Sequence, residues 1–136
     1  MRATPALLLS TALAASGLAA AEPAAAPVGA VQVRCPAAPA AYCEELVLAL
    51  RARLPELAFA ADPAPWGLTL TLTGQSPTRV SGPLALSASQ GGEQILPEAV
   101  VMLIDGAPAT LAPRQLASVL TDLAAPALTA ALALPR

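Results

Sequence analysis

The chain has 136 residues, of which 35 are Ala and 24 are Leu, and seven basic residues face nine acidic ones for a formal net charge of −2. All seven basic residues are Arg, and His, Lys and Asn are absent. These absences exclude a Ser-His-Asp triad, a Schiff-base lysine, a Walker-type phosphate lysine, imidazole metal ligands and N-glycosylation.

Nucleic-acid binding needs a basic footprint and usually stacking aromatic residues. The chain has no basic run, and Phe, Tyr and Trp occur once each. We therefore expect no nucleic-acid partner, and we identify no metal ligands and no cofactor-binding motif.

The first residues have the three parts of a secretory signal peptide. Met1 and Arg2 form a positive n-region, residues 5–18 are apolar apart from Ser and Thr, and Ala19–Ala21 form a small-x-small cleavage pattern. We expect cleavage near Ala21, which would leave 136 − 21 = 115 residues. The apolar run is shorter than the roughly 20 residues of a membrane span, which argues against an uncleaved anchor.

The rest of the chain is long enough for one modest core. We assign residues 22–27 to a flexible lead-in and residues 28–136 to a single domain. The first cysteine, Cys35, lies well past the apolar run and not where a lipid-modified cysteine would lie. We therefore expect a bacterial periplasmic protein with no stable membrane anchor after signal cleavage.

Cys35 and Cys43 are the only cysteines of the chain, and seven residues separate them. In an exported protein such a pair predicts a disulfide. A redox-active pair would favour the Cys-x-x-Cys spacing and basic neighbours, and here only Arg34 is close in sequence. We predict a structural Cys35–Cys43 disulfide.

The first predicted elements are a strand over 28–35, which alternates, and a helix from Pro39 to Leu54 that Pro55 stops. A short edge strand is predicted over 56–60. The buried face of the helix is expected to carry Cys43, Leu46, Val47, Leu50 and Leu54.

A loop over 61–67 leads to the clearest alternation of the chain, over 68–73. There the leucines are expected to point inward and the threonines outward. After a turn over 74–78, a strand over 79–89 alternates again, and the two strands should form an antiparallel hairpin. Its buried side chains are expected to be Val80, Leu84, Leu86 and Ala88, and its exposed ones Ser81, Ser87 and Ser89.

A turn over 90–92 precedes a continuous apolar run over 99–104, which predicts a central strand ended by Asp105 and Gly106. After a loop over 107–111 the last helix follows, with Pro113 in its first turn. Pro126 should kink or split this helix. Its inner face is expected to hold Leu116, Val119, Leu120 and Leu123, followed by Ala127 and Ala131 or by Leu128 and Leu132.

The element order β-α-β-β-β-β-α indicates an α+β fold. We predict a two-layer sandwich in which two helices cover one face of a four- to five-stranded, mostly antiparallel sheet.

Two residues are candidates for partner binding. Trp66 lies between a Pro and a Gly, where it either anchors a partner or covers the sheet edge. Asp105 follows a strand, where ligands gather in α/β sheets, but Asp-Gly is also a common turn. Arg34, Arg79 and Arg114 either converge on an anionic partner or are separate surface charges.

These observations favour an exported, non-catalytic periplasmic domain that acts as a binding or accessory module for another cell-envelope protein. The alternative is a small periplasmic enzyme or thiol-redox factor that uses acidic residues or the cysteine pair. A third hypothesis places the last helix on a membrane surface, but Asp122 and the lack of Lys argue against it.

Overall fold

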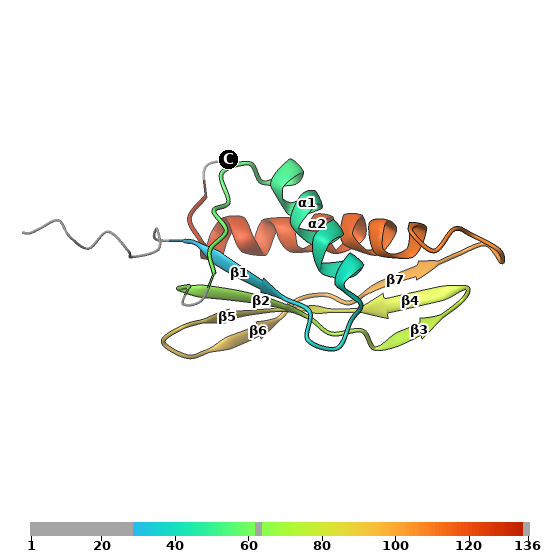
Figure 1. The fold of residues 1–136 in the computed structure, drawn as a ribbon. Coiled ribbons are helices and arrows are strands. Elements are labelled where there is room, and N and C mark those ends of the chain that lie inside the picture. Colours follow the sequence, from blue (N-terminus) through green and yellow to red (C-terminus); the bar gives the residue numbers. More distant parts are fainter. Residues whose placement is uncertain (1–28, 62–63, 135–136) are drawn as a thin grey trace, which may run out of the picture.

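The computed structural model describes residues 29–61 and 64–134, so the predicted signal peptide and the lead-in lie outside the described residues. Two helices cover one face of a layer of strands, which confirms the predicted α+β fold (Figure 1). In chain order the elements are β1 (Val31–Arg34), α1 (Ala40–Arg53), β2 (Trp66–Leu70), β3 (Gly74–Ser76), β4 (Arg79–Gly82), β5 (Leu84–Ala88), β6 (Glu93–Ile95), β7 (Ala99–Met102) and α2 (Leu111–Ala131).

The strands form two sheets, with the orders β1-β2-β5-β6 and β3-β4-β7. The predicted hairpin is confirmed, because β2 pairs antiparallel with β5 and places Leu68 opposite Leu86. The parallel pair is β1 with β2, and α1 lies in the connection between these two strands. Such a connection is usual, since parallel neighbours need a long crossover.

The strand predicted over 79–89 is interrupted at Gly82 and Pro83. A Cβ at Gly82 would lie 2.4 Å from the carbonyl oxygen of Thr71, so no other residue fits this crossing of two backbones. Pro83 adds a residue without an N–H group. The strand predicted over 79–89 is therefore divided between the two sheets. β4 belongs to the sheet β3-β4-β7, and β5 belongs to the sheet β1-β2-β5-β6.

Three further predictions about the strands are wrong. The turn predicted over 74–78 is shorter, because β3 occupies Gly74–Ser76. No regular strand forms over 56–60, where an isolated bridge joins Phe59 to Val31. The run over 99–104 does not form a central strand, because β7 ends its sheet and pairs with β4 only.

The core lies between the helices and the strands. Leu46 and Leu50 of α1 and Leu116, Leu120 and Leu128 of α2 are buried against leucines of β2 and β5, as the spacing predicts. Val119 and Leu123 were predicted to face the core, but each is 38% exposed. The buried face of α2 is instead completed by small residues, which are Ala117, Thr121, Ala124 and Ala125.

Ser81 was expected to face solvent, but it is buried at the bend between the sheets. Its Oγ lies 3.1 Å from Oγ1 of Thr73, which in turn donates to the Glu98 carboxylate. The hydroxyl is therefore buried with a hydrogen-bonding neighbour, which an alternating pattern cannot reveal.

The helix α2 is not split at Pro126 and runs on to Ala131. Pro113 lies in its first turn, as predicted. At its end Ala133 has φ 54°, and the N–H groups of Ala133 and Leu134 donate to the carbonyls of Ala130 and Thr129. This bonding is a Schellman motif, which reverses the chain at a helix end.

The predicted disulfide joins Cys35, just after β1, to Cys43 in the first turns of α1, with a Cα–Cα distance of 5.8 Å. Among the described residues no cysteine is free. The bond therefore fixes the start of the helix to the end of the strand.

Tyr42 is buried in the core, and this burial raises the pKa of its phenol. The chain has no Lys, and both cysteines are disulfide-bonded, so Tyr42 is the one side chain of the sequence whose ordinary pKa is about 10. The folded protein keeps the phenol proton to a higher pH than the unfolded chain does. The contribution of Tyr42 to stability is therefore complete below about pH 10 and is lost as the pH rises through the raised pKa.

We expect the melting temperature to fall as the pH rises above about 10, and Tyr42→Phe to flatten this dependence. Thermal melts of both proteins between about pH 8 and about pH 11 measure it. An equally steep decline in the Phe variant would contradict this origin of the pH dependence.

Candidate binding groove

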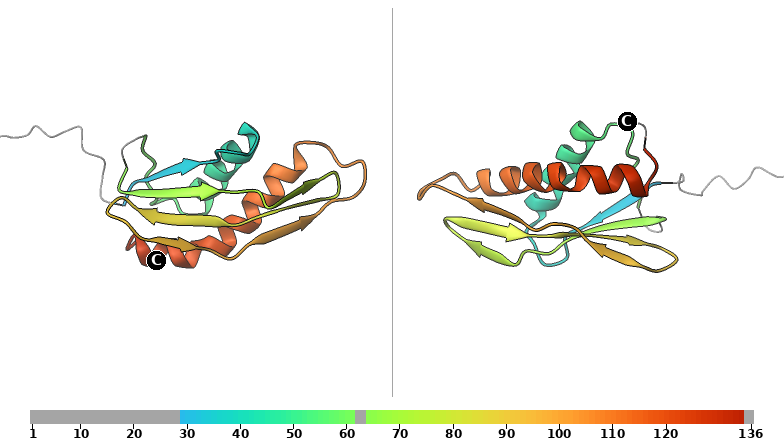
Figure 2. Two further views of the ribbon diagram at one scale, coloured as in Figure 1. Left: turned by 90° about the horizontal axis from the view of Figure 1, so that it is seen from below. Right: turned by 180° about the vertical axis from the view of Figure 1, so that it is seen from behind.

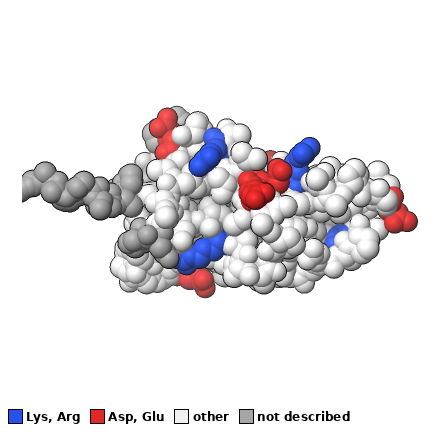
Figure 3. Space-filling model, in the orientation of Figure 1, with Lys and Arg blue, Asp and Glu red and all other residues white. Residues whose placement is uncertain are grey.

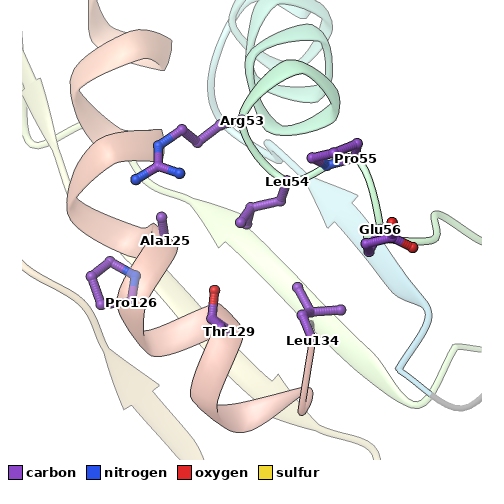
Figure 4. Close-up of a pocket in the computed structure, with 8 residues that line it drawn as sticks. All are labelled: Arg53, Leu54, Pro55, Glu56, Ala125, Pro126, Thr129 and Leu134. Atoms are coloured by element: carbon purple, nitrogen blue, oxygen red, sulfur yellow. The ribbon is translucent and has the colours of Figure 1, made fainter. Parts of the chain in front are cut away.

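A groove of about 530 Å³ lies between the carboxyl end of α1 and the carboxyl half of α2 (Figure 4). Side chains from the two helices and from the segments that follow them form its walls. The lining residues are Arg53, Leu54, Pro55, Glu56, Ala125, Pro126, Thr129 and Leu134. We call this feature the helix groove.

The local sequence explains how one wall forms. Leu54 caps α1, with its N–H donating to the Leu50 carbonyl at 2.8 Å, and Pro55 cannot continue the helical hydrogen bonds. Leu57 then donates to the Leu54 carbonyl, so the chain turns away at this point. Leu54 remains at the floor of the groove, where it is buried.

The other wall depends on the end of α2. The Schellman motif turns the chain back after Ala131, and it thereby places Leu134 across from Leu54 (Figure 4). Ala125 is small and buried, so its position on the helix leaves space between the two walls. The Thr129 hydroxyl points into this space (Figure 4).

Arg53 provides the positive charge of the groove. Its Nε lies 3.6 Å from Oδ1 of Asp122 on α2, and both side chains are exposed. An exposed ion pair contributes only about 0–1 kcal/mol to stability, so a partner can replace it at little cost. The groove thus combines apolar walls with a hydroxyl, one guanidinium and the carboxylate of Glu56. The guanidinium suits an apolar segment that places a carboxylate or carbonyl oxygen near Arg53.

The prediction that Trp66 lies in a loop is wrong. Trp66 is the first residue of β2 and is partly buried against the core. It lines a separate depression of about 260 Å³ together with Leu86, Glu93 and Ala131, among other residues. Ala131 is the last residue of α2, so this depression lies near the same helix end as the helix groove.

Asp105 is exposed in the turn after β7, as an Asp-Gly turn predicts. The loop after β7 and the start of β2 lie at opposite ends of the molecule (Figure 1). Trp66 and Asp105 therefore do not form one site.

The three arginines do not come together either. Arg34 on β1 donates to Oε1 of Gln32, Arg79 opens β4 in the other sheet, and Arg114 on α2 lies 4.0 Å from Glu45. Figure 3 shows basic and acidic side chains interspersed over one face. Within residues 29–61 and 64–134 no group of three acidic or cysteine side chains could hold a metal ion.

None of the residues lining the helix groove was identified as a site from the sequence. Its walls come from residues about 70 positions apart, which meet only because the two helices pack on one sheet. In the sequence, Pro55 and Pro126 indicate only breaks in helices. No local pattern shows that the two prolines flank the same space.

No protein-family model and no curated protein matches the sequence. Among solved structures, the chain is similar to a minor lipoprotein from Acinetobacter baumannii, with 14% identity and a TM-score of 0.48. The match covers 80% of this chain and 96% of that chain. At this level of similarity neither function nor location transfers to this chain. Over the described part of the chain, neither helix has the length and hydropathy that crossing a membrane requires.

Proposed function

We propose that the chain is an exported, non-catalytic periplasmic domain that binds another cell-envelope protein through the helix groove. The observation that carries this proposal is the groove itself. Its volume of about 530 Å³ lies within the range of about 300–1,000 Å³ typical of ligand sites, and its walls are mainly apolar with few polar groups. The partner segment is apolar and places an acceptor oxygen near Arg53.

Two features support export. The first 21 residues have the composition of a signal peptide, and Cys35 and Cys43 form a disulfide. Disulfides persist in oxidising compartments such as the periplasm. The bond links a strand to a helix and contributes no residue to the groove, which supports a structural role for the cysteine pair.

Trp66 remains a proposed second contact of the same partner. Its depression includes Ala131, whereas the helix groove includes Thr129 and Leu134. A partner that covers the end of α2 would therefore reach both. Asp105 lies at the other end of the molecule and has no part in this proposal.

Filling the groove should prevent binding. We expect Thr129→Trp to reduce capture of the partner from periplasmic extract by at least about tenfold, which corresponds to about 1.4 kcal/mol. Ala130→Trp is the matched control, because Ala130 is the next residue, is exposed and does not line the groove. Pull-down beside a thermal melt of each variant gives the comparison.

Arg53→Ala provides a second variant at an exposed position, should Trp at position 129 destabilise the fold. Equal capture by folded Thr129→Trp and Ala130→Trp variants would refute binding in the groove.

A further inference from the structure

The strand β7 leaves one edge of its sheet unpaired. It is the last strand in the order β3-β4-β7, and Figure 2 shows no described strand beyond it. The run from Ala99 to Ile104 is apolar throughout and contains no Pro and no charge. Natural proteins usually protect an edge strand with Pro or charged residues, because an unprotected edge pairs with other strands.

The backbone of β7 shows which groups face this edge. The N–H of Leu103 donates to the Thr78 carbonyl at 2.8 Å, so the backbone N–H and C=O of Leu103 point toward β4. Because the bonding direction alternates along an antiparallel strand, the backbone N–H and C=O of Val101 also point toward β4. Val100 and Met102 then direct their N–H and C=O groups away from β4, toward the open edge.

The side chains on the outer face of the run are apolar and exposed. Val100 is 48% exposed, Met102 68% and Ile104 81%. Val101, which points to the helices, is buried. Val100, Met102 and Ile104 lie in a row along the open edge and are called here the β7 strip.

The helix side of the same edge carries apolar side chains beside the polar Gln115 and Ser118. Val119 of α2 lines a depression of about 380 Å³ with Val100 and Val101. Leu123 follows four residues later on α2, so it lies on the same side of the helix as Val119. Each is 38% exposed, in contrast to their predicted burial. Apolar side chains thus flank the open edge on both faces of the sheet.

We propose that a second copy of this chain pairs with β7, antiparallel and around a two-fold axis at Met102. In this register Met102 lies opposite its own copy, and Val100 lies opposite Ile104. All members of the β7 strip then form cross-strand apolar pairs, which stabilise antiparallel sheets. The α2 helices of the two copies lie on the same face, with Val119 and Leu123 turned toward the axis.

The charges around the strand favour this register. A two-fold at Val101 would place Ile104 opposite the Glu98 carboxylate of the other copy. A two-fold at Met102 places Glu98 opposite Gly106 and Asp105 opposite Ala99, so no like charges face each other. This pairing uses neither the helix groove nor Trp66, so it is independent of the proposed function.

Disulfide trapping tests the register. A hydrogen-bonded antiparallel pair separates its Cα atoms by about 5.5 Å, within the range of about 4.4–6.8 Å that a disulfide spans. We expect Met102→Cys to form a covalent dimer under mild oxidation. Val100→Cys alone should stay monomeric under denaturing conditions, because the two copies of residue 100 lie about 13 Å apart. Mixing Val100→Cys with Ile104→Cys should give the mixed dimer.

Sedimentation of the purified chain tests the dimer itself. The unchanged protein should dimerise with rising concentration, and Met102→Lys should abolish this, whereas Leu48→Lys, at a 59% exposed position on α1, should not. A chain that stays monomeric at every concentration would overturn the proposal. Equal cross-linking of Met102→Cys and Val100→Cys would overturn the register. If Met102→Cys does not fold, the mixture of Val100→Cys and Ile104→Cys gives the same answer.

Discussion

Leu70→Asp is expected to unfold the domain, and Thr71→Asp, one residue later, is expected to leave it folded. Leu70 is 1% exposed on β2 and pairs with Leu84 in the centre of the core. Loss of a buried Leu costs about 2–5 kcal/mol, and an unpaired buried carboxylate adds several kcal/mol more. The sum approaches the whole stability of a small domain, about 5–15 kcal/mol.

Thr71 is the matched control because its side chain is exposed. A surface substitution of this kind usually changes stability by no more than about 0.5 kcal/mol. Thermal melts followed by circular dichroism show whether each of the two variants is folded. Cooperative melts at the same temperature for both would mean that Leu70 does not face the core.

Replacing Cys35 and Cys43 together by Ser is expected to lower the free energy of unfolding by about 2–3 kcal/mol. The bond closes a loop with a sequence separation of 8, and it restricts the unfolded chain more than the folded one. The loop contains Pro36 and Pro39, which already limit the unfolded chain, so the lower end of this range is expected.

Urea unfolding of the double variant and of the unchanged protein measures this difference. Reduction of the unchanged protein is the control, because it should reproduce the loss without a change of residue. A double variant with an unchanged urea midpoint would show that the bond does not stabilise the fold. Catalysis of insulin reduction by the unchanged protein would indicate a redox role instead.

The sequence predicts those parts of the fold that depend on short-range patterns. Leucines at helical spacing between Pro39 and Pro55 predict α1. Alternating leucines predict the β2–β5 hairpin. The disulfide follows from the number and spacing of the cysteines.

The wrong predictions concern neighbours that a local pattern does not specify. The apolar run at β7 resembles a central strand, but no described strand lies on its far side. Val119 and Leu123 have helical spacing, but α2 buries a row of small residues against the rest of the fold instead. Gly82 breaks a strand because Thr71 approaches it closely, and only the folded chain shows this approach.

The candidate site was less predictable than the fold. Trp66 is a candidate from the sequence because it is the single Trp, but in the structure it is partly buried against the core. The helix groove lies where the chain turns after α1 and after α2, and the sequence of either turn alone does not indicate a binding site. Only the packing of the two helices brings Leu54 and Leu134 together.

Photo-crosslinking in living bacteria tests occupancy of the helix groove without purification. A benzophenone amino acid replaces Glu56, an exposed residue of the groove, and in the control it replaces Gln75 on β3, which is also exposed. Binding in the groove predicts an adduct between position 56 and an envelope protein, lost when Thr129→Trp is added and absent from position 75. Identical adducts from both positions, or an adduct that persists with Thr129→Trp, would contradict it.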